Sequence, residues 1–90
     1  MEYEFELTEK ANNDIEGILY YLSKRLMTPQ SAAHFMDALT KGFNRICTFP
    51  ESGEVLENKF VPTDLIRKAL IGRYVIYYLI MKRKKKILIL

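Results

Sequence analysis

The 90-residue chain, with a mass of 10.6 kDa, is long enough for one small folded domain and too short for two separate hydrophobic cores. An apolar fraction of 49% and a charged fraction of 28% are typical of a folded protein and exclude a disordered tail. The longest apolar run, residues 74–81, is far shorter than the roughly 20 residues of a membrane-spanning helix. The acidic N-terminus does not resemble a secretory signal, so we expect a single cytoplasmic domain over residues 1–90.

The net charge of +3 is unevenly distributed along the sequence. Residues 1–64 carry eleven acids and six bases, a net charge of −5, whereas residues 65–90 carry eight bases and no acid, a net charge of +8. This asymmetry favours a basic surface that binds an anionic partner, either a nucleic acid or an acidic protein, over a solvated edge that only maintains solubility. The candidate binding residues are Arg67, Lys68, Arg73, Lys82, Arg83, Lys84, Lys85 and Lys86.

The first predicted elements are a strand and an amphipathic helix. Apolar side chains alternate with glutamates over residues 2–7, which is the period of a half-buried strand. Thr8 is a typical helix N-cap, and apolar residues then recur every three or four positions over residues 9–26. This spacing predicts a helix with one apolar stripe.

A second helix is predicted directly afterwards. Thr28 and Pro29 suit the N-cap and the first helical position, an apolar stripe follows over residues 32–47, and Pro50 ends the pattern. Because the connection is short, we expect the two helices to form an antiparallel hairpin.

The remaining sequence predicts a long connection over residues 50–64 and then strands over residues 65–71, 74–81 and 87–90. Gly72-Arg73 reads as a turn between the first two of these strands, and residues 82–86 read as a basic hairpin connection.

The run 74–81 is apolar on both faces, so it belongs in the middle of a sheet, covered at least in part on each side. The predicted element order is therefore β-α-α-β-β-β. This order defines an α+β fold in which a helical hairpin packs on one face of a small, mostly antiparallel sheet.

No motif indicates a metal or a cofactor, and we expect neither. His34 is the only histidine and Cys47 the only cysteine, which is too few for a His/Cys metal site and for an internal disulfide. We interpret His34 as a structural or surface side chain and Cys47 as a small buried residue.

Lys, Arg and Tyr side chains are the remaining candidates for chemistry. A Lys or Tyr with a shifted pKa can remove the 2′-hydroxyl proton of RNA while Arg or Lys stabilises the charged phosphorane. The same residue types also suit single-strand binding, because bases stack on aromatic rings. Composition leaves both alternatives open.

The assembled pattern resembles the RelE/ParE superfamily of toxins from type II toxin–antitoxin systems. Three segments carry the resemblance and cover nearly the whole chain: YEFELTEKANNDIEGILYYL, SAAHFMDALTKGFNRICTFPESG and IGRYVIYYLI. The most family-like pieces are Phe49-Pro50 followed by Gly53, and the turn Gly72-Arg73-Tyr74 that leads into an aromatic strand.

The resemblance implies a bacterial growth inhibitor that a cognate antitoxin holds inactive. RelE-like members cleave mRNA in the ribosomal A site with Lys, Arg and Tyr side chains, whereas ParE-like members bind DNA gyrase and block replication. We also expect the antitoxin to bury apolar groups against the sheet and helices and to place acids opposite residues 67–86, so that it associates faster at low salt.

The ParE-like function is favoured by the long paired helices, the modest net charge and the Gly72-Arg73-Tyr74 turn. The RelE-like alternative, a metal-independent endoribonuclease, implies that Arg67 and Arg73 are catalytic. Members usually continue past the position of Leu90 with a short basic, aromatic tail that their activity requires, whereas this sequence ends at Ile-Leu-Ile-Leu. Either the sequence is truncated, or this copy has lost activity and retains only antitoxin binding. The third hypothesis is therefore an inactive or purely nucleic-acid-binding relative.

Overall fold

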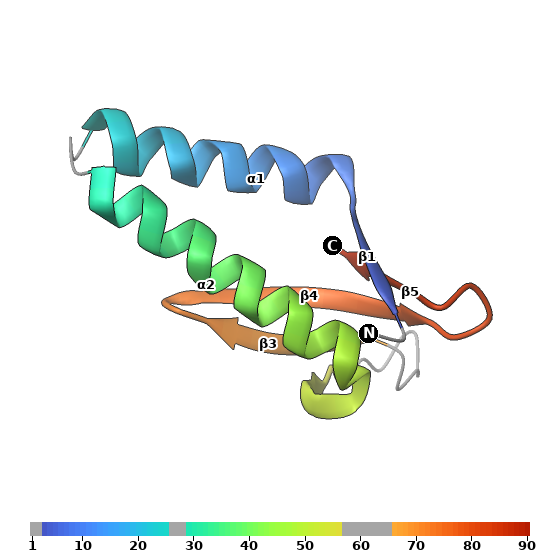
Figure 1. Ribbon diagram of the computed structural model, residues 1–90. Coiled ribbons are helices and arrows are strands. Elements are labelled where there is room, and N and C mark those ends of the chain that lie inside the picture. Colours follow the sequence, from blue (N-terminus) through green and yellow to red (C-terminus); the bar gives the residue numbers. More distant parts are fainter. Residues whose placement is uncertain (1–2, 26–28, 57–65) are drawn as a thin grey trace.

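The computed structural model describes residues 3–25, 29–56 and 66–90, which form a five-stranded sheet and two long helices (Figure 1). The observed order of strand, two helices and then strands confirms the predicted α+β fold. In chain order the elements are β1 (Glu4–Leu7), α1 (Glu9–Tyr20), a π-helical turn (Tyr21–Arg25), α2 (Pro29–Thr48), a 3₁₀ turn (Pro50–Ser52), β2 (Glu54–Val55), β3 (Ile66–Ile71), β4 (Tyr74–Met81) and β5 (Lys86–Ile89).

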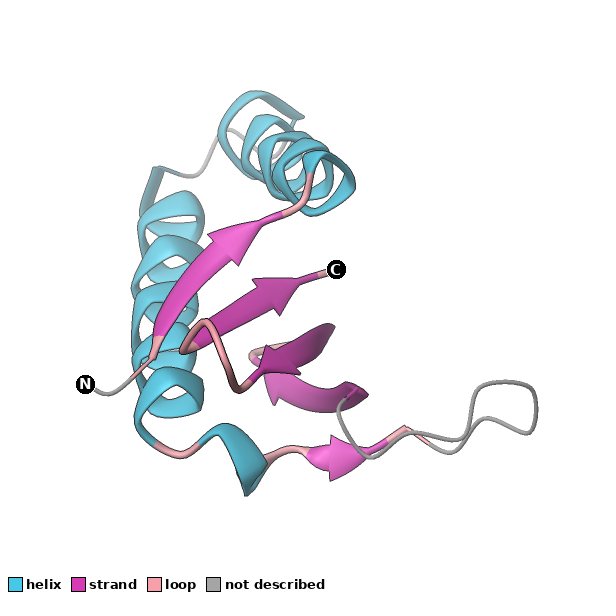
Figure 2. Ribbon diagram, turned by 90° about the vertical axis from the view of Figure 1, so that its right-hand side faces the viewer, coloured by secondary structure: helices cyan, strands magenta, loops and turns pink. Residues whose placement is uncertain are grey.

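The strand order in the sheet is β1-β5-β4-β3-β2 (Figure 2). β1 and β5 are parallel, and the other neighbours are antiparallel. β4 occupies the middle position, as its apolar side chains predict, but its two edges are paired over different lengths. Residues 74–79 pair with β3, whereas only residues 78–81 pair with β5.

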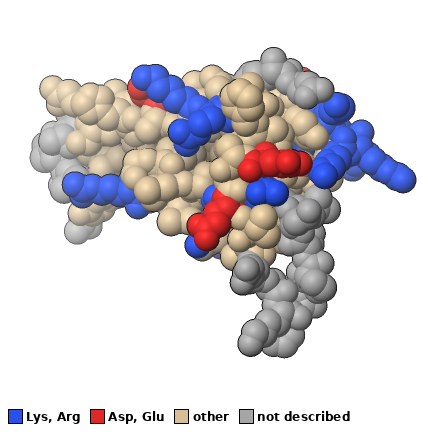
Figure 3. All heavy atoms as spheres, turned by 90° about the horizontal axis from the view of Figure 1, so that it is seen from below, with Lys and Arg blue, Asp and Glu red and all other residues tan. Residues whose placement is uncertain are grey.

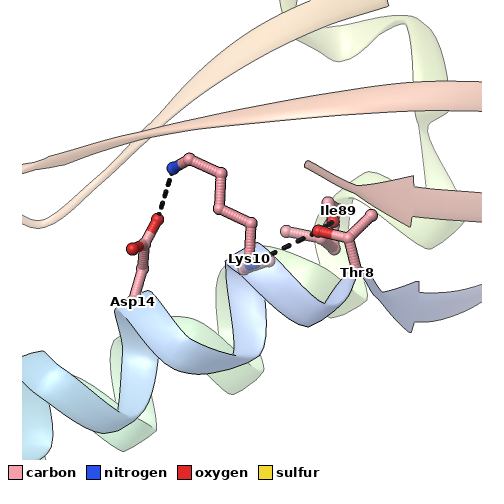
Figure 4. A network of polar contacts seen from close by, with 5 residues as sticks. Thr8, Lys10, Asp14 and Ile89 are labelled. Carbon is pink, nitrogen blue, oxygen red and sulfur yellow. Dashed lines mark hydrogen bonds and ion pairs between the residues drawn. The ribbon is translucent and has the colours of Figure 1, made fainter.

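Thr8 joins β1 to α1, as the sequence predicts. Its hydroxyl accepts a hydrogen bond from the backbone N–H of Ala11 at 3.1 Å, which satisfies a free donor of the first helical turn. The same hydroxyl donates to the carbonyl of Ile89 at 2.9 Å, so the cap also ties α1 to the end of β5 (Figure 4). Further along the same helix, Lys10 forms an exposed ion pair with Asp14 at 2.7 Å (Figure 4).

α2 covers one face of the sheet, and α1 runs in roughly the opposite direction, close to α2 near the π-helical turn and diverging from it toward the sheet (Figures 1 and 2). The approach of α2 to β3 is close, because a Cβ at Gly42 would lie 2.5 Å from Cδ1 of Ile71. The ring of Phe43 of α2 contacts the ring of Phe5 of β1 in a tilted arrangement, with 4.8 Å between the ring centroids. The buried core between these layers consists of Ala11, Phe35, Leu39, Phe43, Ile46, Cys47, Ile71, Tyr78, Ile80, Ile87 and Ile89.

Two predicted segments differ in detail from the structure. The helix predicted over residues 9–26 changes to π-helical winding at Tyr21–Arg25. The connection predicted over residues 50–64 contains the strand β2, which pairs with β3. A strand of two residues is too short to produce a recognisable period, so the sequence could not reveal it. Residues 57–65 of this connection lie outside the described residues.

The two predicted hairpin turns are present. Gly72 has a φ of 61°, the left-handed conformation that a two-residue hairpin loop requires at its first position. The second connection is one residue shorter than predicted, because Lys86 already belongs to β5. The predicted N-cap Thr28 and the predicted strand residues 2 and 65 lie outside the described residues.

The face of the sheet opposite α2 is open in the part of the chain that the structure describes. Alternate residues of β3 and β4 point to this face, and Leu70, Val75 and Tyr77 are 66%, 49% and 42% exposed there. The expected cover on the second face of β4 is therefore incomplete, and an apolar surface faces solvent.

Candidate functional site

Arg67 lies on β3 directly opposite Tyr78 of β4, and both side chains hold the corner that follows α2. The Arg67 guanidinium donates from Nη1 to the carbonyl oxygens of Gly53, at 2.8 Å, and Glu51, at 3.3 Å. The Tyr78 hydroxyl accepts from the N–H of Gly53 at 2.9 Å and donates to the carbonyl of Pro50 at 2.7 Å. We call residues 50–53 the corner segment. Two side chains from the sheet satisfy four of its backbone polar groups, three carbonyls and one N–H.

This arrangement gives Arg67 a structural role. The side chain is half-buried, and within the described residues its Nε has no hydrogen-bond partner although it is shielded from solvent. A buried donor without a partner costs free energy, and the two hydrogen bonds from Nη1 to the corner segment offset part of this cost. The guanidinium is thus already occupied by backbone carbonyls.

Arg73 lies far from Arg67, in the exposed turn between β3 and β4. The four strand residues between Arg67 and the end of β3 alone span about 13 Å, at about 3.3 Å per residue. The two arginines that the RelE-like alternative requires therefore lie toward opposite ends of one hairpin and do not meet at one site.

Five of the other candidate bases, residues 82–86, lie at the end of the sheet that carries the β4–β5 turn, where Lys and Arg atoms cluster in Figure 3. The sixth, Lys68, lies within β3 opposite Tyr77. The structure brings acids from the first part of the chain beside three of them. Lys68 lies 3.9 Å from Glu54, Lys82 lies 4.0 Å from Glu51, and Lys86 lies 3.8 Å from Glu6.

Such exposed pairs contribute at most about 1 kcal/mol each, but they reduce the positive potential around these lysines. Counting charged residues along the sequence did not reveal this neutralisation, because strand pairing decides which acids lie beside which bases. Arg83 and Lys84 are exposed, and no carboxylate of the described residues lies within 4.0 Å of either. Lys85 lies 5.6 Å from the ring centre of Tyr3.

His34 and Cys47 have different environments on α2. His34 is exposed, whereas Cys47 is fully buried in the core, as predicted for a small apolar residue. Among the described residues, no group of three His, Cys, Asp or Glu side chains is arranged to hold a metal ion.

Burial raises the pKa of the Cys47 thiol, because desolvation disfavours the thiolate. The unfolded chain therefore loses this proton at lower pH than the folded chain does, and ionisation favours unfolding as the pH rises. We expect the stability of the protein to fall more steeply above the ordinary thiol pKa than that of Cys47→Ala. Urea titrations of both proteins at a series of alkaline pH values test this, and parallel pH profiles would contradict it.

A groove of about 530 Å³ lies between α1 and β4. Its walls include Ile15 and Ile18 of α1, Phe35 of α2 and Tyr74 of β4. Phe35 and Tyr74 meet edge to face at 5.1 Å between ring centroids.

One edge of β4 opens onto this groove. The N–H of Leu90 donates to the carbonyl of Tyr77 at 2.8 Å, and beyond this bond residues 74–76 pair with β3 alone among the described strands. Apolar walls of this kind can receive an apolar segment of another chain. The sequence does not reveal the groove, because the apolar stripe of α1 lines the groove and also packs in the core. A periodic pattern cannot distinguish these two environments.

Comparison with protein families identifies the class of protein. Residues 5–90 match the model of the ParE toxin of the type II toxin–antitoxin system, parDE. The chain therefore belongs to the ParE toxin family, and a cognate antitoxin is its expected partner. Neither the curated proteins nor the solved structures contain a significant match. No helix in residues 3–25 or 29–56 is long and apolar enough to cross a membrane.

Proposed function

We propose that this ParE-family protein inhibits growth in the cytoplasm by binding DNA gyrase. The observation that carries the proposal is the placement of Arg67 and Arg73. A nuclease of the RelE-like kind needs bases that converge on one phosphate, so that one group removes a proton while another stabilises the developing charge. Here Arg67 bonds the corner segment, and Arg73 occupies a turn at the other end of the hairpin.

A binding inhibitor needs accessible side chains and no assembled catalytic site. Arg73 is exposed in a two-residue turn, and Leu70 and Val75 expose apolar surface beside it. An exposed arginine next to apolar side chains is a typical anchor of protein–protein interfaces. These residues support a contact with gyrase at the β3–β4 turn.

The groove between α1 and β4 supports a separate site for the antitoxin. Its apolar walls suit an apolar antitoxin segment. Because the groove ends near the β3–β4 turn, a bound antitoxin would cover surface next to Arg73 and so block the target contact.

The test compares two reactions of the purified protein. We expect it to inhibit DNA supercoiling by purified gyrase and to leave mRNA intact in a translation reaction analysed by primer extension. Arg73→Ala should weaken gyrase inhibition about fivefold, because an interface arginine typically contributes about 1 kcal/mol or more. Lys41→Ala, an exposed change on α2, is the matched control and should have no effect.

Pulse labelling after induction in growing bacteria provides the cellular readout. We expect thymidine incorporation to fall before methionine incorporation. If methionine incorporation falls first and mRNA is cleaved, the protein is an endoribonuclease and the proposal is wrong. If neither label falls, the chain is an inactive relative, which also contradicts the proposal.

A further inference from the structure

A second concave surface lies at the opposite end of β4 from the groove. It is a hollow of about 380 Å³ beside the β4–β5 turn. Leu79, Ile80 and Met81 of β4 form one part of its lining, and Lys82, Arg83 and Lys84 of the turn form the other. Because lysine and arginine carry long aliphatic stems, this lining combines an apolar floor with cationic groups at its rim. We call it the turn hollow.

The turn beside the hollow is held in a fixed shape. Lys85 adopts a left-handed conformation with φ of 56°, which is uncommon for a residue other than glycine or asparagine. Its N–H lies 3.3 Å from the carbonyl of Lys82, and its own carbonyl accepts from the N–H of Glu4 on β1 at 3.0 Å. The backbone that carries the cationic side chains is therefore held in place before any partner arrives.

The rim carries positive charge that the described part of the chain does not neutralise. The Lys82 ammonium lies 4.0 Å from the Glu51 carboxylate. Arg83 and Lys84 have no carboxylate within that distance among the described residues. Both are exposed in the β4–β5 turn. This excess charge favours an acidic partner.

The chemistry of the floor distinguishes between two kinds of acidic partner. Single-stranded nucleic acid is bound by stacking bases on aromatic rings, and none of the six residues lining the hollow is aromatic. An aliphatic floor with a cationic rim fits instead a peptide with one large apolar side chain between carboxylates. We propose that the turn hollow binds such an acidic segment of a partner protein, with the apolar side chain on Leu79 and Met81 and the carboxylates on Arg83 and Lys84.

A fluorescein-labelled peptide, Gly-Ser-Glu-Asp-Phe-Glu-Asp-Ser-Gly, is the probe for this site, and fluorescence anisotropy is the readout. We expect the double variant Arg83→Glu/Lys84→Glu to bind it at least about tenfold more weakly than the wild type. The matched control, Lys24→Glu/Lys41→Glu, makes the same change of charge on the helical side and should change the affinity less than about twofold. A peptide with Ser in place of Phe should also bind at least about fivefold more weakly, because it lacks the apolar anchor.

Thermal melting of both double variants first establishes that they fold as the wild type does. The proposal is overturned if the two double variants lose equal affinity, if the Ser peptide binds as well as the Phe peptide, or if no binding occurs at about 1 mM peptide. Tighter binding of a short DNA duplex through Arg83 and Lys84 would assign the turn to nucleic acid and also overturn it. None of these measurements involves gyrase or growth, so their outcome is independent of the proposed function.

Discussion

Gly53→Ala is expected to lower the free energy of unfolding by about 3 kcal/mol. A Cβ at this position would lie 2.3 Å from the hydroxyl oxygen of Tyr78 and 2.8 Å from the backbone carbonyl of Lys68. Neither atom has room to move, because Tyr78 is fully buried and Lys68 belongs to the β3–β4 ladder. The backbone of Gly53, with φ of −76°, suits any residue, so the loss comes from space alone.

Urea and thermal unfolding measure this change. For a domain of this size, a loss of about 3 kcal/mol corresponds to a fall of about 15 °C in the melting temperature. Gly17→Ala on α1 is the matched control, because its Cβ would meet nothing within 4 Å. It should stabilise the protein by up to about 1 kcal/mol through helix propensity. A Gly53→Ala protein as stable as the wild type would show that the corner segment does not have this close packing.

Tyr78→Phe is expected to cost about 2 kcal/mol while the ring stays buried. The substitution removes one acceptor and one donor, which leaves the N–H of Gly53 and the carbonyl of Pro50 without their partner. Tyr77→Phe is the control, because this neighbouring side chain is 42% exposed on the open face. It should change the stability by less than about 0.5 kcal/mol.

A double-mutant cycle with Arg67→Met tests whether the two side chains hold the corner segment together. They bond to the same short stretch of backbone, so their effects should not be additive. If the two losses simply add, Arg67 and Tyr78 act independently. Urea unfolding of the two single variants and the double variant distinguishes these results.

The structural role of Arg67 affects how mutations in this protein are interpreted. Loss of toxicity in an Arg67 variant does not identify a catalytic group, because the change also releases the carbonyls of Gly53 and Glu51. Arg73 provides the cleaner test, since it is exposed in a turn. Gyrase inhibition is therefore best compared between the wild type and an Arg73 variant, and stability between the wild type and an Arg67 variant.

Periodic patterns predicted the elements that are long enough to show them. The alternation near the N-terminus indicated β1, two apolar stripes with their caps indicated α1 and α2, and the continuous apolar run indicated that β4 is central. β2 has two residues and cannot show a period, and the π-helical turn at Tyr21–Arg25 has the same apolar spacing as an ordinary helix end. These two features depend on contacts between elements.

The sequence predicted which residues are candidates for the site but not how they are arranged in space. The sequence identified all eight bases of residues 65–90 and treated them as one surface. In the structure Arg73 lies apart, Arg67 turns to the corner segment, and three lysines lie within 4.0 Å of acids from distant parts of the chain. Among the described residues, Arg83 and Lys84 of the β4–β5 turn and Arg73 of the β3–β4 turn have no carboxylate within 4.0 Å.

The sequence by itself determined the family, the element order and the position of β4 in the sheet, because local periodicity and short motifs encode these properties. The tertiary structure decided which charges remain available, where the groove and the turn hollow lie, and that Arg67 supports the fold. These properties depend on pairing between residues far apart in the chain, such as Glu6 with Lys86 and Gly53 with Tyr78. Strand register sets those pairings, and register is specified by the turns and by which face of each strand is buried.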